Sequence, residues 1–283
     1  MQWFITGCSS GLGLELARAV LDAGQIVIAS SRRPDKTPSL VAEIQGRGGQ
    51  WIALDTAGPD VEKVIAETAA KYGPIDVLVN NAGYGTVGPL ETQSTGIMQK
   101  MLAANLFGPI RASQTIIPSM RERRAGTIVN VSSGEFWFAH AGIAIYGASK
   151  FAVEGVSEAL QKEVANFGIR VLLAEPGGMR TSLIDPAKPE LFAAMPETYK
   201  DTMVDHTLKG LSMLHGNQSL DPKRVAAAIV KEVLDPTLSK DGKPMLRMPL
   251  GKESIGGMRS RADEFKETAE VFETRALECD FPE

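Results

Sequence analysis

Short apolar runs alternate with longer segments of helical periodicity through most of the chain. The expected strands are residues 3–6, 26–29, 51–54, 77–79, 128–131 and 171–174, followed by a short last strand at 245–248. The expected helices are residues 12–23, 61–72, 97–123 (one helix or two), 146–167 and 225–234. Strands that are apolar at nearly every position are buried on both faces, as in parallel sheets. The pattern therefore predicts an α/β fold with a doubly wound parallel sheet.

The alternation is interrupted in the last third of the chain. Residues 182–220 are apolar but broken by prolines, which is typical of a lid over a substrate site and not of a second domain. We therefore expect a single domain over residues 1–250 that carries this lid. Residues 251–283 form a charged C-terminal extension, in which 259–283 are expected to be a helix lying on the protein surface.

Composition narrows the class of protein. The 283 residues are 43% hydrophobic and 23% charged, and 30 Lys and Arg against 34 Asp and Glu give a net charge of −4. This charge argues against nucleic acid as a partner. The sequence has no run approaching the ~20 apolar residues of a membrane span and no signal-peptide pattern at its start. Cys8 and Cys279 suggest no disulfide framework, and the histidines show no metal-ligand spacing, so we expect a cytoplasmic protein without a metal.

A glycine-rich loop joins the first expected strand to the first expected helix. It reads Thr-Gly-Cys-Ser-Ser-Gly-Leu-Gly over residues 6–13. Glycines let the backbone approach a ligand closely, and the following helix N-terminus favours a pyrophosphate. The residues expected to contact a dinucleotide here are Gly7, Ser9, Ser10, Gly11, Leu12 and Gly13.

The end of the second expected strand bears on the choice of cofactor. An acidic residue there would bind the ribose 2′-hydroxyl of NAD, but the sequence has Ser31, Arg32 and Arg33. A hydroxyl and two cations suit a 2′-phosphate, so NADP(H) is favoured over NAD(H). The alternative is that the two arginines are a solvated loop pair, with nearby Asp35 favouring NAD.

Four polar residues form a candidate catalytic set. Tyr146 and Lys150 lie four positions apart on one face of an expected helix, and Ser133 precedes the tyrosine by thirteen positions. A lysine cation near a tyrosine favours the tyrosinate and lowers the tyrosine pKa, as acid–base catalysis near neutral pH needs. Ser132 is the alternative serine, and strand alternation would point it to the opposite side. Asn105 is the fourth member, although an asparagine near a helix start is often only a cap.

Two further motifs are Asn80-Asn81-Ala82-Gly83 and the Pro-Gly-Gly-Met-Arg-Thr run at 176–181. Together, all these motifs resemble those of the classical short-chain dehydrogenase/reductase family. The ordered motifs cover residues 2–181. The resemblance implies a Rossmann fold with Tyr146 as general acid in reduction and general base in oxidation. It also implies that Lys150 binds a ribose hydroxyl, that Ser133 orients the substrate oxygen, and that Asn105 holds a proton-relaying water.

The resemblance also implies contacts to the cofactor. It places Ser10 and Leu12 on the phosphates, Asp55 on the adenine, Asn81, Ala82 and Gly83 on the adenosine ribose, and Pro176, Gly177, Met179 and Thr181 on the nicotinamide, with Tyr146 and Lys150 beside it. Thr56 departs from the aliphatic residue that is usual in the family, which weakens the adenine assignment. Hydride transfer from the B face is expected.

The segment between Ser133 and Tyr146 is expected to shape the substrate pocket. The candidate pocket residues are Glu135, Phe136, Trp137 and Phe138, with Met195 and Tyr199 from the lid. Consecutive aromatic rings suggest a lipophilic or ring-containing substrate, although at least one of them is expected to pack as core. Methionines in the lid fit an adaptable apolar cover or ordinary helix packing equally well.

The sequence thus predicts an NADP(H)-dependent carbonyl reductase or alcohol dehydrogenase that acts on a small lipophilic ketone or secondary alcohol. The alternative is a non-catalytic NADP(H)-binding sensor or scaffold on the same fold. An epimerase or dehydratase of the extended type ranks last, because its glycine spacing is TGxxGxxG and this chain has TGxxxGxG. The resemblance implies a homodimer or homotetramer paired through the helices at 107–123 and 146–167.

Overall fold

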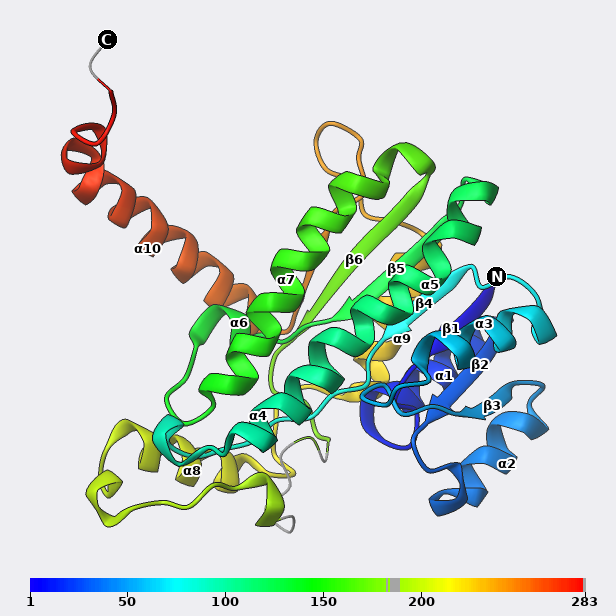
Figure 1. Cartoon of the computed structure of the whole chain (residues 1–283), viewed down its shortest axis with the longest axis horizontal. Helices are drawn as coiled ribbons and strands as arrows, with labels where there is room; N and C mark the ends of the chain where they lie inside the picture. The colour runs from blue at the N-terminus through cyan, green and yellow to red at the C-terminus, as the bar shows by residue number, and fades with distance from the viewer. Residues whose placement is uncertain (182, 184–188, 282–283) are drawn as a thin grey trace.

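A single seven-stranded parallel sheet organises the computed structural model, which describes residues 1–181, 183 and 189–281 (Figure 1). The strands are β1 Gln2–Ile5, β2 Ile26–Ser31, β3 Gln50–Ala53, β4 Val77–Asn80, β5 Gly126–Val131, β6 Ile169–Pro176 and β7 Arg247–Leu250. Their order across the sheet is β3-β2-β1-β4-β5-β6-β7. Every strand overlaps a predicted one, and the doubly wound α/β fold is confirmed.

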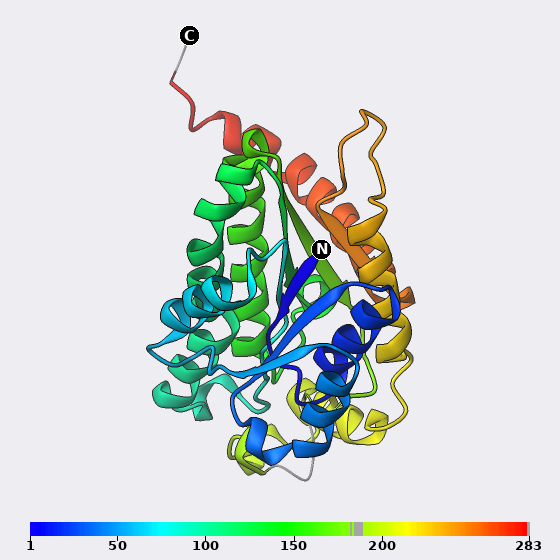
Figure 2. The same ribbon diagram turned by 90° about the vertical axis from the view of Figure 1, so that its right-hand side faces the viewer.

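Helices cover both faces of the sheet (Figure 2). They are α1 Gly11–Asp22, α2 Pro38–Gly46, α3 Val61–Tyr72, α4 Thr95–Leu102, α5 Gly108–Arg123, α6 Glu135–Phe138, α7 Ala144–Val164, α8 Met203–Leu214, α9 Pro222–Leu234 and α10 Lys252–Leu277. Helices α1, α2 and α9 pack in one core with Trp3 and Ile5 of β1. Helices α3, α5 and α7 pack in the other with Phe4. Alternation along β1 thus supplies both cores, as expected for a central strand.

The predicted helix at 97–123 is two α-helices joined by one π-helical turn. The turn spans Ala103–Phe107 and contains the buried Asn105. Such turns insert one extra residue and often occur at functional sites, because they re-aim a side chain. Sequence periodicity did not predict α2 or α8, which the structure adds to the expected helices.

A chain of buried polar contacts ties helix α7 to the sheet. Asn80 at the end of β4 donates to Asn130 Oδ1 of β5 (2.8 Å), and Asn130 donates to Ser157 Oγ of α7 (2.8 Å). Satisfied buried polar networks fix one arrangement of the elements that they join. This network therefore fixes the position of the helix that carries Tyr146 and Lys150.

The C-terminal extension departs from its prediction. Helix α10 begins at Lys252, earlier than expected, and projects away from the body of the molecule instead of lying on its surface (Figure 1). Its first turns are anchored, since Ser254 is buried and Gly257 lies against Trp137 and Phe138. Residues 262–281 are all exposed. Nine of these twenty residues are charged, which leaves the segment without an apolar face wide enough to pack on the domain.

The lid is described only in part, because residues 182 and 184–188 of the predicted 182–220 segment lie outside the described residues. The remainder contains helix α8 and a short parallel bridge between Val87 and Phe192. Within the described ranges, no helix is long and apolar enough to cross a membrane.

Candidate active site

The predicted site residues gather at the carboxyl edge of the sheet. The chain reverses its winding direction between β1 and β4, and ligands of open α/β sheets bind at this point. The glycine-rich loop follows β1, Asn81 follows β4, Ser133 follows β5 and Gly177 follows β6. The topology therefore brings together motifs that are spread over more than half of the sequence.

At its three glycines the glycine-rich loop packs too closely against its neighbours to accept a side chain. A Cβ on Gly7 would lie 2.8 Å from the Ala82 Cα, and one on Gly13 would lie 2.3 Å from the Gly7 carbonyl oxygen. A Cβ on Gly11 would lie 3.2 Å from Thr181 Cγ2, so the segment after β6 lies against this loop. Ser10 precedes helix α1 in an extended conformation and makes no side-chain cap. The loop and the helix N-terminus thus fit a pyrophosphate that approaches the backbone directly.

Asn81 contacts the glycine-rich loop itself. Its side-chain amide donates to the carbonyl oxygens of Thr6 (2.9 Å) and Gly7 (3.3 Å). The Thr6 hydroxyl accepts from the backbone amides of Asn81 and Ala82 (3.0 Å each). These contacts hold the loop after β4 against the glycine-rich loop, while the ribose contacts assigned to residues 81–83 stay predictions.

The candidate 2′-phosphate residues have different environments. Ser31 is buried, and its hydroxyl oxygen accepts from Trp51 Nε1 (3.0 Å). Arg33 forms an exposed ion pair with Asp35 (3.1 Å). Arg32 is exposed and makes no hydrogen bond or ion pair with any residue that the structure describes. Arg32 is therefore the cation at this edge that is available to an anionic ligand.

Asp55, the adenine candidate, lies just after β3. It is exposed, and its carboxylate accepts from the backbone amide of Ala57 (3.0 Å). The neighbouring Thr56, which departs from the family pattern, is buried. Asp55 thus stabilises the turn that follows β3, and its adenine contact stays a prediction.

Ser133, Tyr146 and Lys150 lie together. The Tyr146 side chain is buried, and Ser133 lies close enough to affect the pKa of its hydroxyl. The Lys150 ammonium is also buried, 5.7 Å from the centre of the Tyr146 ring, and donates to the Val131 carbonyl oxygen (2.9 Å). The thirteen-residue and four-residue intervals in the sequence therefore do correspond to one cluster of side chains.

Burial sets the protonation states of this cluster. It raises the pKa of Tyr146 to about 12, an effect that Ser133 opposes and the nearby Glu135 carboxylate reinforces. Burial lowers the pKa of Lys150 to about 8, opposed by the charge of Glu154. At neutral pH the tyrosine therefore holds its proton and the lysine is mainly cationic. This is the state required of a proton donor with an adjacent cation.

Asn105 is hydrogen-bonded to the loop that follows β4. Its side chain accepts from the Tyr84 backbone amide (3.0 Å) and donates to the Tyr84 carbonyl (2.9 Å) and to Ser149 Oγ (3.0 Å). A Cβ on Gly83 would lie 3.0 Å from Asn105 Oδ1 and 3.9 Å from Lys150 Nζ. Because Gly83 has no side chain, a small space remains that both Asn105 and Lys150 border.

Glu135 is held by His140. The Glu135 carboxylate accepts from the His140 backbone amide (2.5 Å) and contacts the ring Nδ1 (2.7 Å). This contact raises the pKa of His140. Glu135 also contacts the catalytic cluster, because its backbone amide donates to Ser133 Oγ (3.2 Å) and its carboxylate reinforces the raised pKa of Tyr146. The backbone amide of Phe136 donates to the Ser133 carbonyl oxygen (3.1 Å).

The aromatic rings of α6 surround a buried ionic cluster. Arg247 lies 5.4 Å from the Phe136 ring centre and 5.9 Å from that of Trp137. Its guanidinium donates to Glu175 (3.1 Å) and to Glu154, and Trp137 Nε1 donates to Glu175 (3.1 Å). These contacts match the expectation that some of the rings pack internally, and they do not assign Phe136 or Trp137 to a substrate pocket. The Phe138 ring is partly exposed and lies against α10 at Gly257.

The lid contacts the tyrosine through residues that were not singled out. Tyr146 shares a buried apolar cluster with Val87, Met101 and Ile143, and the partly buried residues packed against it are Tyr84, Ile145, Phe192, Leu208 and Leu211. The apolar composition of residues 182–220 was the sequence feature that could have identified Phe192, Leu208 and Leu211 as lid residues near Tyr146. The lid candidates Met195 and Tyr199 are themselves partly buried.

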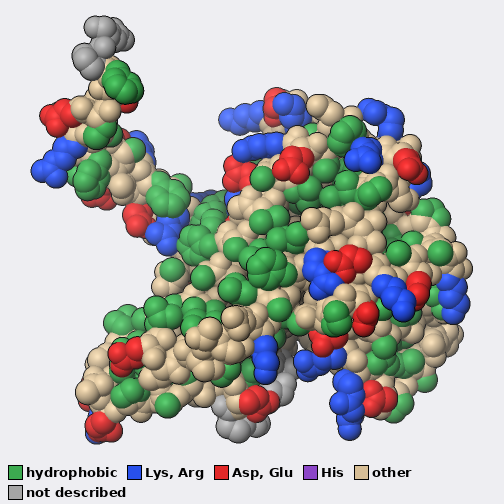
Figure 3. All heavy atoms as spheres, viewed as in Figure 1, with side chains coloured by type: hydrophobic (Ala, Val, Ile, Leu, Met, Phe, Trp, Pro, Cys, Tyr) green, Lys and Arg blue, Asp and Glu red, His purple; other side chains and the backbone are tan. Residues whose placement is uncertain are grey.

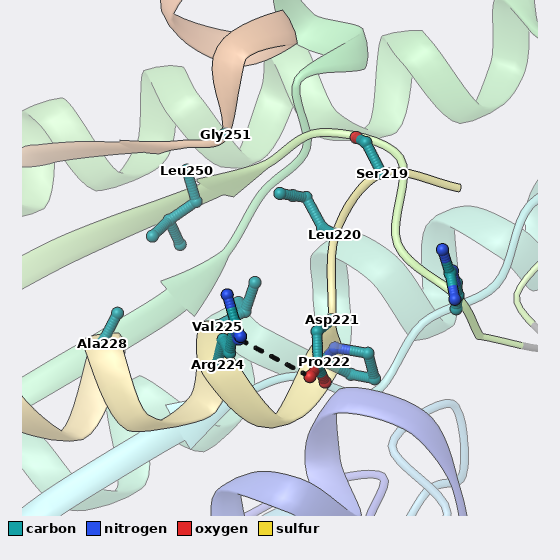
Figure 4. A pocket seen from close by; sticks show the side chains of 10 residues that line it. Ser219, Leu220, Asp221, Pro222, Arg224, Val225, Ala228, Leu250 and Gly251 are labelled. Atoms are coloured by element: carbon teal, nitrogen blue, oxygen red, sulfur yellow. Dashed lines mark ion pairs between the residues drawn. The ribbon is translucent and has the colours of Figure 1, made fainter. Parts of the chain in front are cut away.

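A separate hollow of about 560 Å³ lies beside this site, between α9, the end of β7 and Arg180 (Figure 4). Leu220, Val225 and Leu250 contribute apolar side chains to it. Its lining includes none of Ser133, Tyr146 and Lys150, so it is distinct from the catalytic cluster.

The fold and the serine–tyrosine–lysine cluster define an open α/β protein with a candidate active site at the carboxyl edge of its sheet. The family model for the short chain dehydrogenases matches residues 2–191, and the chain belongs to this family. Oxidoreductase claN of Passalora fulva is 45% identical over 73% of this chain and 94% of its own length. Retinol dehydrogenase 8 of Bos taurus is 36% identical over 81% and 76%. A short-chain dehydrogenase structure from Streptomyces avermitilis has a TM-score of 0.85, 33% identity, and coverage of 99% and 98%.

Both nicotinamide cofactors occur among similar folds. A putative gluconate 5-dehydrogenase from Beutenbergia cavernae with bound NADP is 26% identical, with a TM-score of 0.66 and coverage of 81% and 88%. A Burkholderia phymatum family member in complex with NAD is 22% identical, with a TM-score of 0.71 and coverage of 83% and 85%. The protein is therefore an oxidoreductase of a family whose members bind NAD or NADP.

Proposed function

We propose that this protein is an NADP(H)-dependent oxidoreductase that interconverts a lipophilic or ring-containing ketone and the corresponding secondary alcohol. The observation that carries the proposal is the cluster of Ser133 with the buried Tyr146 and Lys150. The direction of the two pKa shifts, upward for Tyr146 and downward for Lys150, supports a protonated tyrosine beside a cationic lysine at neutral pH.

When bound, the reduced nicotinamide supplies a hydride to the carbonyl carbon. Ser133 donates a hydrogen bond to the substrate oxygen, which orients the carbonyl and stabilises its developing negative charge. Tyr146 transfers its phenolic proton to that oxygen. The Lys150 cation lowers the cost of the tyrosinate left behind and offers donors to a ribose hydroxyl. In the direction of oxidation the same residues act in reverse, with the tyrosinate as base.

The preference for NADP(H) rests on Arg32. Its guanidinium is exposed beside the end of β2, where the ribose of a dinucleotide lies in this fold. Arg33 contributes less, because Asp35 already neutralises it. A planar guanidinium matches the 2′-phosphate of NADP, whereas NAD has a neutral hydroxyl at this position.

The lipophilic substrate class rests on the surroundings of Tyr146. Besides the polar groups of the catalytic cluster, Tyr146 belongs to an apolar cluster against which Tyr84, Phe192 and Leu208 pack. Such a lining favours substrates with apolar bodies and one polar group. Retinol dehydrogenase 8, a relative of this chain, is named for an apolar alcohol.

We also propose that the protein pairs through α5 and α7, as the family resemblance implies. A hollow of about 310 Å³ on this face is lined mainly by side chains of these two helices, and Phe107 and Val156 expose apolar surface nearby. The resulting assembly would be a homodimer or a homotetramer.

The test of the proposed function is a panel of aromatic and polycyclic ketones assayed with NADPH and NADH, followed by the absorbance of the reduced nicotinamide. Turnover that prefers NADPH and favours the more apolar ketones would support it. Tight NADPH binding without turnover of any ketone, or of alcohols with NADP⁺, would instead indicate a non-catalytic sensor.

A further inference from the structure

Helix α10 ends in a long segment that the rest of the described structure does not cover. The helix has 26 residues, and its contacts with the domain are at its base, near α6 and β7 (Figures 1 and 2). Every residue from 262 to 281 is exposed. Isolated helices are only marginally stable in water, and most helices in proteins owe their stability to packing of an apolar face.

The projecting segment carries a regular apolar stripe, which we term the α10 stripe. Its members follow the alternating three- and four-residue spacing of a coiled coil and are Ile255, Met258, Ala262, Phe265, Ala269, Phe272, Ala276 and Cys279. Phe265 is 59% exposed and Phe272 53% exposed. Apolar side chains stand among charged ones along this helix in Figure 3. Val271 and Leu277 are also exposed but lie outside the stripe.

The stripe alternates large and small side chains in its outer half. One of the two core positions of the heptad repeat is occupied by Phe265 and Phe272, and the other by Ala262, Ala269 and Ala276. Two parallel copies would place phenylalanine against phenylalanine and alanine against alanine. Two antiparallel copies would place each phenylalanine against an alanine, which allows large and small side chains to interlock. The pattern is thus self-complementary in the antiparallel orientation.

We propose that α10 forms an antiparallel pair with α10 of a second copy of this chain, an interface separate from the proposed α5 and α7 pairing. In the favoured register Phe272 packs opposite Ala269 of the second copy, and Phe265 opposite Ala276. The same register places Lys266 beside Glu273 of the second copy. The two-fold symmetry of the pair generates this opposite-charge contact twice.

The position of the segment permits this pairing. The register uses residues 262–279, all of which are exposed and lie beyond the anchored turns around Ser254 and Gly257. The two domains therefore lie at opposite ends of the helix pair. At 1.5 Å per residue the helical part of the paired segment, residues 262–277, is about 24 Å long, enough to separate the two domains.

The test compares the solution mass of three proteins by sedimentation equilibrium. Phe265→Gln with Phe272→Gln removes the apolar side chains of the stripe, and Val271→Gln with Leu277→Gln is the matched control on the same exposed helix. We expect the first variant to have half the mass of the wild type and the control to keep the wild-type mass. The dissociation constant of this step should rise about 100-fold or more. Unchanged circular dichroism and NADPH binding would show that the domain remains folded.

A charge exchange tests the orientation. Lys266→Glu alone and Glu273→Lys alone should each weaken the association, and the double variant should restore it, because the pair is rebuilt across the interface with reversed signs. Equal masses for the wild type and the Phe265/Phe272 variant would overturn the proposal. Flotation of the wild type with phosphatidylcholine–phosphatidylserine vesicles, with the mass unaffected by these variants, would overturn it in favour of membrane binding.

Discussion

Replacing Arg247 by methionine should destabilise the protein through the two buried carboxylates that it neutralises, while its third partner, Glu158, is exposed. Glu154 is 2% exposed and Glu175 is fully buried, and the Arg247 guanidinium donates to both. Methionine keeps most of the side-chain volume near Phe136 and Trp137 but removes the charge. The variant therefore isolates the electrostatic contribution of the cluster.

The expected loss is about 3 kcal/mol of unfolding free energy near pH 8. Removing one partner of a buried ion pair costs about 3–5 kcal/mol, and the lower end applies because Arg247 is 24% exposed and water reaches part of the site. For a chain of this size the loss corresponds to a decrease in Tm of roughly 6–12 °C.

The loss should depend on pH. Burial raises the pKa of Glu175 to about 7, well above its ordinary value of 4.5. The folded state therefore binds this proton more tightly than the unfolded state, and the resulting stability is present below pH 4.5 and lost as the pH rises through 7. Without Arg247 the carboxyl pKa rises further, so the destabilisation should shrink by about 1–2 kcal/mol between pH 8 and pH 6.

The assay is urea unfolding followed by circular dichroism at pH 6 and pH 8. The control is Arg224→Met, because Arg224 is 90% exposed in a 4.0 Å ion pair with Asp221 and should contribute almost nothing. A variant Arg247→Met that is as stable as the wild type at pH 8, or more destabilised at pH 6 than at pH 8, would refute this reasoning.

Three further predictions concern the cofactor and the catalytic cluster. Gly13→Ala places a Cβ 2.3 Å from a backbone oxygen and should weaken NADPH binding at least about tenfold by titration, while Gly46→Ala, with open space around it, should not. Arg32→Gln should raise KM for NADPH about tenfold and leave KM for NADH nearly unchanged, and equal effects on both would count against the 2′-phosphate assignment. Lys150 has a pKa of about 8, so ketone reduction should fall above pH 8 as its cation is lost. Lys150→Met should lower kcat about 100-fold and remove this alkaline decline; a decline that persists in the variant would contradict the assignment.

Much of the fold was predictable because apolar strands are a local signal. A run such as Val77–Val79 is apolar at every position, so it predicts a buried strand without knowledge of the strands beside it. Turn residues mark where such runs end. The motifs of the site follow these strand ends, so a parallel sheet brings them to one edge. Their contacts were less predictable. The bond of the Asn81 amide to the glycine-rich loop depends on the pairing of β1 with β4, which no local pattern contains.

Contacts that depend on long-range packing are the hardest to predict from the sequence. The rings of Phe136 and Trp137 pack around Arg247, which is more than 100 positions away in the sequence, and no local pattern indicates this contact. Their assignment to the substrate pocket stays a prediction. The path of α10 depends on whether another surface covers its narrow apolar stripe, and a charged sequence indicates a helix without indicating its direction.

The most direct test of the proposed mechanism is the steady-state reduction of a good ketone substrate by Tyr146→Phe. The phenylalanine ring fills the same buried site without the hydroxyl, so folding and NADPH binding should be retained. We predict that kcat falls about 1,000-fold, because the proton donor is lost. A variant that binds NADPH normally and keeps near-normal turnover would contradict the role of Tyr146 as the acid.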